Sequence, residues 1–273
     1  DCIEYGCKPD CSLGTRYRIN PQEYVMTRIS FSRIGGYLFL AAGTVLGPGT
    51  VFAFWVFLLL GPLHLFRLDV SEPLALLFNA SLSLLFFLQH SILIRPSFRA
   101  WAIRFIPLHY YGPLYAVTAG GILLAIMLLW QESNTIIVAF NGPSRWLFHS
   151  LYGVALAGFI WCIWALRGVD AFGLNALSAH LSGATPPKSP FIIRGPYRWI
   201  RHPVYFFWIV MLWSSPILSA DRLLLNLIWS TWLIIATFLE DRDLGITLGS
   251  RYDEYRRHVP MLIPHTLFAA WRR

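Results

Sequence analysis

The chain has 273 residues, of which 56% are hydrophobic and only 13% are charged. Soluble domains carry roughly 25% charged residues, so this composition excludes an ordinary soluble domain and indicates a membrane protein. The net charge of +8 is explained better by orientation in the membrane and contact with anionic lipid than by nucleic acid. We therefore expect the lipid bilayer as a partner and no nucleic acid.

Residues 1–25 differ from the rest of the chain. They are polar and rich in cysteine, and they lack the apolar run of a signal peptide. The spacing of the cysteines matches no zinc or haem pattern, so we expect free thiols and no metal site. We interpret 1–25 as an N-terminal extension.

Six apolar segments are candidates for membrane-spanning helices, each of which needs about 20 apolar residues. The first is longer than one span requires and contains Gly47-Pro48-Gly49, which predicts a kink or a tilted helix. The fifth is short for a span, and a turn at 219–221 makes the last two a helical hairpin. The expected spans are 33–64, 74–94, 111–130, 146–166, 204–218 and 223–239. The sequence thus predicts an all-α polytopic membrane protein with four helices in 26–166 and a catalytic, cofactor-binding region in 167–273.

The basic residues predict the orientation. If the N-terminus is cytoplasmic, all but three of the 22 Lys and Arg residues fall on the cytoplasmic side, the exceptions being Arg67, Arg145 and Arg222. This distribution follows the positive-inside rule for six spans with both termini in the cytoplasm. We expect a multi-pass protein of a bacterial inner membrane.

Polar residues gather at the cytoplasmic ends of these helices. Gln89-His90-Ser91 ends the second helix, Glu240-Asp241 ends the last one, and a long loop with a Pro-rich strap at 182–190 joins the fourth helix to the fifth. Polar groups at membrane depth are costly and usually functional, so we expect these segments to converge on a cytoplasmic site.

The loop ends in RGPYRWIRHPVY, in which Pro203 suits the first turn of the fifth helix. Arg201 and His202 then stand at a helix start, where they can meet an anion or a carboxylate. Glu240 has two interpretations from the residues alone: a functional acid, or a side chain that reaches water or pairs with Arg201.

The segments RGPYRWIRHPVY, LEDRDL and YDEYRRHVPMLIP, in this order, resemble the C-terminal signature of the isoprenylcysteine carboxyl methyltransferase superfamily. Upstream, FLQHS at 87–91, RPSFRAW at 95–101 and VDAFGL at 169–174 resemble bacterial methanethiol S-methyltransferases and related denitrification-associated membrane proteins. The resemblance covers nearly all of residues 30–264.

The resemblance implies that S-adenosylmethionine binds between the helical hairpin and the strap. It assigns to the cofactor the backbone at Pro190, Phe191 and Ile192 and the side chains of Tyr197, His202, Tyr205 and Glu240. We include Arg201 in this set, and we expect Glu240 to hold the amino group of the cofactor.

The sequence departs from relatives in ways that bear on the substrate. The isoprenylcysteine branch has an arginine one turn before the glutamate, whereas this chain has Ala236; the methanethiol enzymes have a glutamine where this chain has Asn175-Ala176. Reductase relatives have Gly-Glu where this chain has Phe206-Phe207, which argues against a nicotinamide reductase.

We expect methyl transfer to the sulfur of a small or hydrophobic thiol, with His90, or Asp170 acting with it, as the base that removes the thiol proton. The alternatives are methylation of a lipid or prenylcysteine carboxylate, and a non-catalytic membrane protein that helps to assemble respiratory enzymes. The sequence does not define the oligomeric state.

Overall fold

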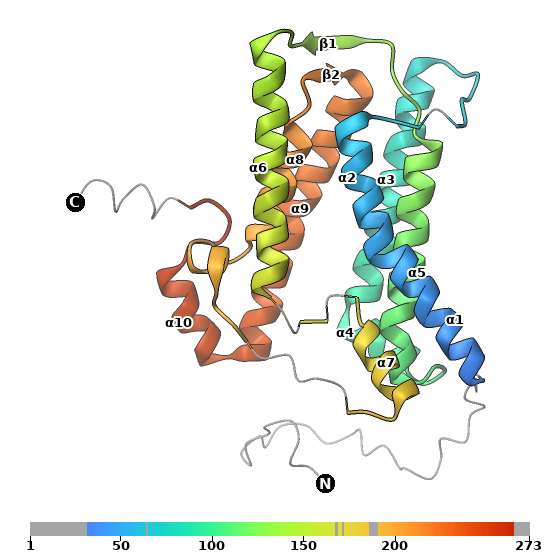
Figure 1. Cartoon of the computed structure of the whole chain (residues 1–273), viewed down its shortest axis with the longest axis vertical. Coiled ribbons are helices and arrows are strands. Elements are labelled where there is room, and N and C mark those ends of the chain that lie inside the picture. The colour runs from blue at the N-terminus through green and yellow to red at the C-terminus, as the bar shows by residue number, and fades with distance from the viewer. Residues whose placement is uncertain (1–31, 64, 167–168, 171, 186–190, 265–273) are drawn as a thin grey trace.

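The computed structural model describes residues 32–63, 65–166, 169–170, 172–185 and 191–264. Within these ranges the chain is mainly helical with two short strands, which confirms the predicted all-α membrane fold (Figure 1). Five helical segments there are long and apolar enough to cross a membrane. They are Arg33–Leu60, α3 (Glu72–Ile94), α5 (Leu108–Leu129), α6 (Pro143–Ala165) and α9 (Ala220–Leu248).

The first span contains the predicted irregularity. It consists of α1 (Arg33–Thr44), a π-helical turn η1 (Val45–Gly49) and α2 (Thr50–Leu60). Pro48 lies inside the turn and has no N–H to donate, which favours a local widening of the helix. A Cβ atom on Gly120 of α5 would lie only 1.6 Å from the carbonyl oxygen of Leu46, so a glycine is needed where α5 packs against this turn.

The fifth expected span is shorter than predicted. Helix α8 (Pro203–Trp213) has 11 residues and rises about 16 Å, roughly half of the hydrocarbon core of a bilayer. It ends because Pro216 disfavours helical backbone at the preceding residue. The chain then forms β2 (Ile217–Ser219), which pairs antiparallel with β1 (Ile136–Ala139); the sequence did not indicate this pairing.

A buried arginine, Arg222, connects the end of α2 to the end of α8, close to the two strands. The side chain of Arg222, which the charge distribution assigns to the outer side of the membrane, is turned into the protein, with 8% of the residue exposed. Its Nη2 donates to the carbonyl oxygen of Leu58 near the end of α2 at 2.9 Å and to that of Leu212 near the end of α8 at 3.5 Å. The carbonyl ends of helices carry partial negative charge, so they stabilise this cation in an apolar core.

The helices pack in the order α6, α8, α9, α3, α5 and α2, with the last two also in contact with η1. Aromatic rings fill the space between them. The ring of Phe54 is fully buried and stacks on Trp229 at a centroid distance of 4.7 Å, and Trp229 stacks on Phe86 at 5.3 Å. This aromatic core joins α2, α3 and α9 into one bundle.

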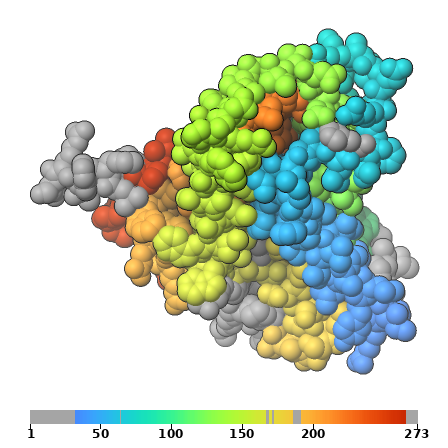
Figure 2. All heavy atoms as spheres, turned by 45° about the horizontal axis from the view of Figure 1, so that its top comes forward, coloured from blue at the N-terminus to red at the C-terminus, as the bar shows by residue number. Residues whose placement is uncertain are grey.

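The two ends of the bundle differ. One end carries α4 (Pro96–Ala102), α7 (Leu174–Ser182) and α10 (Ser250–His258), together with the start of α1 (Figure 1). The other end carries β1 and β2, and Figure 2 shows a hollow there between α2 and the green β1 segment. We refer to these as the α10 end and the β end. The predicted site residues lie toward the α10 end.

Candidate active site

Arg201 and His202 meet a carboxylate of the same chain. Nε and Nη2 of Arg201 lie 2.8 and 3.2 Å from the two carboxylate oxygens of Asp241, and His202 Nε2 lies 3.2 Å from Oδ1. The paired side chains of Arg201 and Asp241 are only 9% and 6% exposed. The sequence predicted an anion or a carboxylate at this helix start, and Asp241 of α9 takes that place. Because this pair uses the guanidinium fork, it does not support the predicted contact of Arg201 with the cofactor.

Asp241 also connects α10 to the place where α9 meets the start of α8, which we call the Asp241 junction. Tyr252 Oη donates to Asp241 Oδ1 at 2.7 Å, and Arg256 Nε lies 3.4 Å from Oδ2. Arg201 Nη1 donates in turn to the carbonyl oxygen of Val259 at 2.6 Å. Burial, and then the hydrogen bond to Asp241, raise the pKa of Tyr252, so its hydroxyl keeps the proton that it donates. One carboxylate therefore joins α9, the start of α8 and α10.

Glu240 stands beside Asp241 in sequence and has a different partner. It is exposed, and its Oε2 accepts a hydrogen bond of 2.5 Å from Tyr205 Oη. Consecutive side chains of a helix point about 100° apart, which separates the two acids. The pairing of Glu240 with Arg201 is therefore not seen among the described residues, because Asp241 takes that place. The other interpretations, an acid that reaches water and a functional acid, both agree with its exposure.

Further tyrosines lie near the Glu240 carboxylate. Tyr115 of α5 and Tyr197 of η2 (Gly195–Arg198) are within electrostatic range of it. Burial raises the pKa of Tyr197 well above its ordinary value, so its hydroxyl stays neutral. The backbone of Tyr197 is held by Tyr255 of α10, whose Oη donates to its carbonyl oxygen at 2.5 Å. Three of the residues predicted for the cofactor, Tyr197, Tyr205 and Glu240, are thus brought together.

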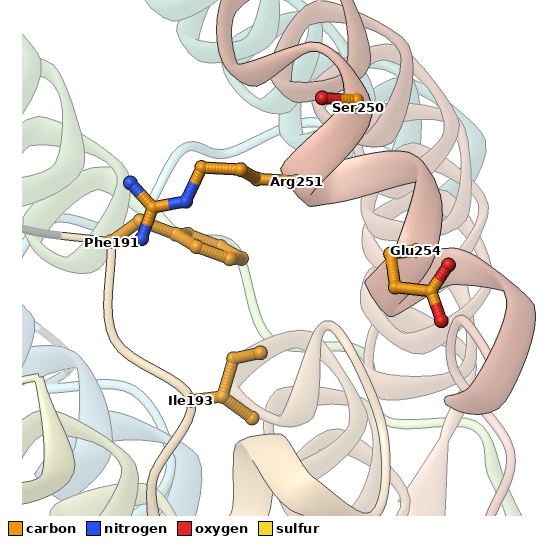
Figure 3. A pocket seen from close by; sticks show the side chains of 5 residues that line it. All are labelled: Phe191, Ile193, Ser250, Arg251 and Glu254. Carbon is orange, nitrogen blue, oxygen red and sulfur yellow. The ribbon is translucent and has the colours of Figure 1, made fainter.

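A pocket of about 480 Å³ lies between the loop at 191–193 and α10 (Figure 3). Phe191 reaches it from the loop, and Arg251 extends from α10 toward the ring of Phe191. The residues that line it are Phe191, Ile193, Ser250, Arg251 and Glu254. Of the loop residues predicted for the cofactor, Phe191 lines this pocket, Ile192 is half-buried beside it, and Pro190 lies outside the described residues.

The pocket borders a group of aromatic rings. Phe191 packs against Tyr252 and Tyr255 at centroid distances of 6.1 and 5.8 Å. The three-residue spacing of these tyrosines puts both on the buried face of α10. Arg251 and Glu254 each precede one of them and so lie on the neighbouring, exposed face. Arg251 and Glu254 were not among the predicted site residues, and the Tyr252–Tyr255 spacing is the signal in the sequence that places them on an accessible face of α10.

His90 lies inside the bundle, on the face of α3 that meets α5. The hydroxyl oxygen of Tyr115 is 3.0 Å from Nδ1 and 3.1 Å from Nε2 of His90. The imidazole also packs on the ring of Phe86, at 5.2 Å between centroids. Because Tyr115 is within range of Glu240 as well, His90 belongs to the same region of the molecule as the predicted cofactor residues.

The predicted partnership of Asp170 with His90 is not seen in the described residues. Asp170 instead caps α7: its Oδ1 accepts from the backbone N–H of Leu174 at 2.9 Å and its Oδ2 from that of Asn175 at 2.7 Å. The next turn is fixed by Gly173, which has a φ of 68° and lies against Gly112 of α5. The VDAFGL motif therefore docks α7 on α5, and Asp170 has a structural task that occupies both carboxylate oxygens.

Comparison with known proteins gives a consistent set of relatives. The chain is 32% identical over 212 residues to Methanethiol S-methyltransferase 1 of Bradyrhizobium diazoefficiens, which covers 75% of the chain and 70% of the relative. It is 32% identical over 203 residues to Methanethiol S-methyltransferase of Pseudomonas sp. (strain GM41(2012)), which covers 71% and 75%. Nurim of Rattus norvegicus is 28% identical over 196 residues, which covers 64% and 70%.

No family model matches the chain, and no solved structure matches it. The assignment therefore depends on the curated relatives. An identity of 32% over more than two thirds of both chains is sufficient, and it agrees with the motifs quoted above. This integral membrane protein belongs to the methanethiol S-methyltransferase family.

Proposed function

We propose that the protein transfers a methyl group from S-adenosylmethionine to the sulfur of a small or hydrophobic thiol, which gives a thioether. The observation that carries the proposal is the hydrogen bond between Tyr205 and Glu240, because it joins the two motifs that the resemblance assigns to the cofactor. The printed names of the bacterial relatives support a thiol sulfur as the acceptor.

The residues at this place suit the cofactor. When bound, S-adenosylmethionine supplies a methyl group activated by a sulfonium centre. Its amino group is cationic, and Glu240 offers an exposed carboxylate that Tyr205 orients through one oxygen. Phe191 and Tyr197 add aromatic surface on the loop, with Tyr255 in contact with both of them.

The chain's own residues have three tasks in this proposal. The Asp241 network fixes the start of α8 and so the position of Tyr205. Glu240 holds the cofactor. His90 takes the proton of the acceptor. A base is needed because an alkyl thiol has a pKa of about 8.5, the value for cysteine, or higher, and only the thiolate is a good nucleophile.

The position one turn before Glu240 favours a neutral acceptor. It is occupied by Ala236, a half-buried residue of α9 without charge or hydrogen-bonding capacity. A carboxylate substrate would be left without a cation at this position, whereas a neutral thiol does not need one. This observation supports a thiol over a lipid or prenylcysteine carboxylate.

For the orientation we propose that the α10 end faces the cytoplasm of a bacterial cell and that both termini lie on that side. The basic residues of α4, η2 and α10 support this, since they gather at one end of the bundle. The candidate site would then have access to a cytoplasmic supply of the cofactor.

The decisive experiment uses the purified protein in detergent with labelled S-adenosylmethionine. Alkyl thiols, an aromatic thiol and a prenylcysteine are offered as acceptors, and the labelled product is identified by mass. We expect a labelled thioether. Label in a methyl ester of the prenylcysteine alone would establish the carboxylate alternative, and cofactor binding without any product would favour the non-catalytic one.

A further inference from the structure

A seam of polar side chains joins α3 to α5 inside the apolar bundle. Gln89 Nε2 donates to Thr118 Oγ1 at 2.9 Å, and the next residue of α3, His90, meets Tyr115 of α5. Tyr115 and Thr118 are three residues apart and therefore share one face of their helix. Polar groups at this depth in a membrane protein are costly, so the seam requires an explanation beyond packing.

Tyr115 has a central place in this seam. Its hydroxyl oxygen lies within 3.1 Å of both ring nitrogens of His90. The same hydroxyl is within electrostatic range of Glu240 and of the Tyr205 hydroxyl that orients it. In the part of the chain that the structure describes, no hydrogen bond joins His90 directly to Glu240 or Tyr205. Tyr115 thus contacts the proposed base directly and lies in the same region as the proposed cofactor site.

A second observation indicates that a small polar group binds in the seam. Gln89 Oε1 belongs to the amide that bonds Thr118, and it is buried without a hydrogen-bond partner among the described residues. Buried polar atoms in native proteins nearly always have a partner in the protein, in ordered water or in a ligand. This unused acceptor belongs to the residue next to His90 and to an amide bonded to the turn of α5 that carries Tyr115. It is suited to the S–H group of a thiol or to a water that precedes it.

We propose that Tyr115 is a catalytic residue that passes the thiol proton to His90; this inference rests on the proposed thiol methylation. Tyr115 Oη accepts the proton of the S–H group while it donates its own proton to a ring nitrogen of His90. The electron pair of the S–H bond stays on the acceptor sulfur and forms the new S–CH₃ bond. The methyl group leaves its sulfonium, whose sulfur keeps the pair of the broken bond, and His90 then releases its proton to water.

The chain offers a matched control for this test. Tyr111 lies one turn before Tyr115 on α5, and its hydroxyl donates to the backbone oxygen of Leu93 at 2.5 Å. Tyr115→Phe and Tyr111→Phe each remove one tyrosine hydroxyl group from α5. We expect Tyr115→Phe to lower kcat for an alkyl thiol about 10²-fold, the usual size of a lost general-base contribution, and Tyr111→Phe to leave it nearly unchanged.

The acidity of the substrate separates a proton relay from a structural role. An aromatic thiol is largely ionised at neutral pH and needs no base, so Tyr115→Phe should affect it far less than an alkyl thiol. The losses from Tyr115→Phe and His90→Ala should also fail to add in the double variant, because the two residues act as one unit. Equal losses on both thiols, or fully additive losses, would overturn the inference and leave the proposed function intact.

The contact between Tyr115 and His90 can also be tested by a measurement that does not depend on enzyme activity. Nuclear magnetic resonance of ring-labelled histidine in the cofactor-free protein reports the surroundings of His90. Its signals should shift in Tyr115→Phe and stay in place in Tyr111→Phe. Unchanged His90 signals in Tyr115→Phe would show that the contact does not exist. A wild-type protein that methylates no thiol would instead remove the proposed function itself, and the inference with it.

Discussion

Replacing Asp241 by asparagine tests the junction on which the candidate site is built. The substitution keeps the size of the side chain and removes the charge that meets the bidentate fork of Arg201, the imidazole of His202 and the hydroxyl of Tyr252. It leaves the guanidinium of Arg201, 9% exposed, without its counter-ion. Breaking a buried ion pair by removing one partner typically costs about 3–5 kcal/mol. We take about 3 kcal/mol, because asparagine can still accept one hydrogen bond.

Thermal unfolding in detergent measures this loss. A change of 1 kcal/mol shifts Tm by about 2–4 °C in chains approaching this size, so Asp241→Asn should lower Tm by roughly 6–12 °C. Asp243→Asn is the matched control. Its carboxylate lies two residues further along α9 and makes half-exposed pairs with Arg95 and Arg242, at 3.3 and 3.5 Å, and such surface pairs contribute about 0–1 kcal/mol.

The loss of stability in Asp241→Asn should also be confined to the region around α10. Asp241 connects α9 to α10, so amide exchange in α10 should accelerate more than exchange in α3 or α5, which do not contact Asp241 through any hydrogen bond in the described residues. Equal Tm values for the two variants, or uniform acceleration of exchange, would refute the assignment of Asp241 as the residue that holds this junction.

The remaining predictions concern the ligands and the orientation. Glu240→Ala should weaken binding of S-adenosylmethionine and S-adenosylhomocysteine by about 2 kcal/mol in calorimetry, because it removes a charge-assisted contact; an unchanged affinity would remove Glu240 from the site. His90→Ala should lower kcat for an alkyl thiol about 10²-fold and leave cofactor affinity nearly unchanged, whereas a normal rate would make His90 a packing residue. A cysteine placed at Arg104 should react with an impermeant reagent only from the cytoplasmic side, and a cysteine placed at Arg145 only from the opposite side. The reverse pattern would contradict the proposed orientation.

The membrane architecture could be predicted because it depends on local sequence properties. Apolar runs of sufficient length predict spanning helices, and Gly47-Pro48-Gly49 predicted an irregularity where the structure has a π-helical turn. The short α8 was harder to predict. The apolar composition continues to Leu218, beyond the end of α8 at Trp213, and only Pro216 in that stretch disfavours helix.

Contacts between distant segments could not be predicted in the same way. The pairing of β1 with β2 joins residues about 80 positions apart, and no local pattern specifies it. Asp170 was interpreted as a possible partner of the base because it is an acid beside a functional motif. The structure instead shows its carboxylate bonded to the first N–H groups of α7, from four residues before the helix begins, which is further away than an ordinary cap residue lies.

The adjacent acids at the end of α9 explain how one short motif can serve both structure and chemistry. In sequence, Glu240 and Asp241 are equivalent carboxylates. In the structure, the rotation between neighbouring helix positions buries Asp241 among cations and a tyrosine hydroxyl, while Glu240 stays exposed and contacts Tyr205. A buried acid with all of its partners inside the protein has no capacity left for a ligand, whereas an exposed acid oriented by one hydroxyl does. The site therefore needs both: Asp241 fixes the start of α8, and that fixed helix carries the tyrosine that orients Glu240.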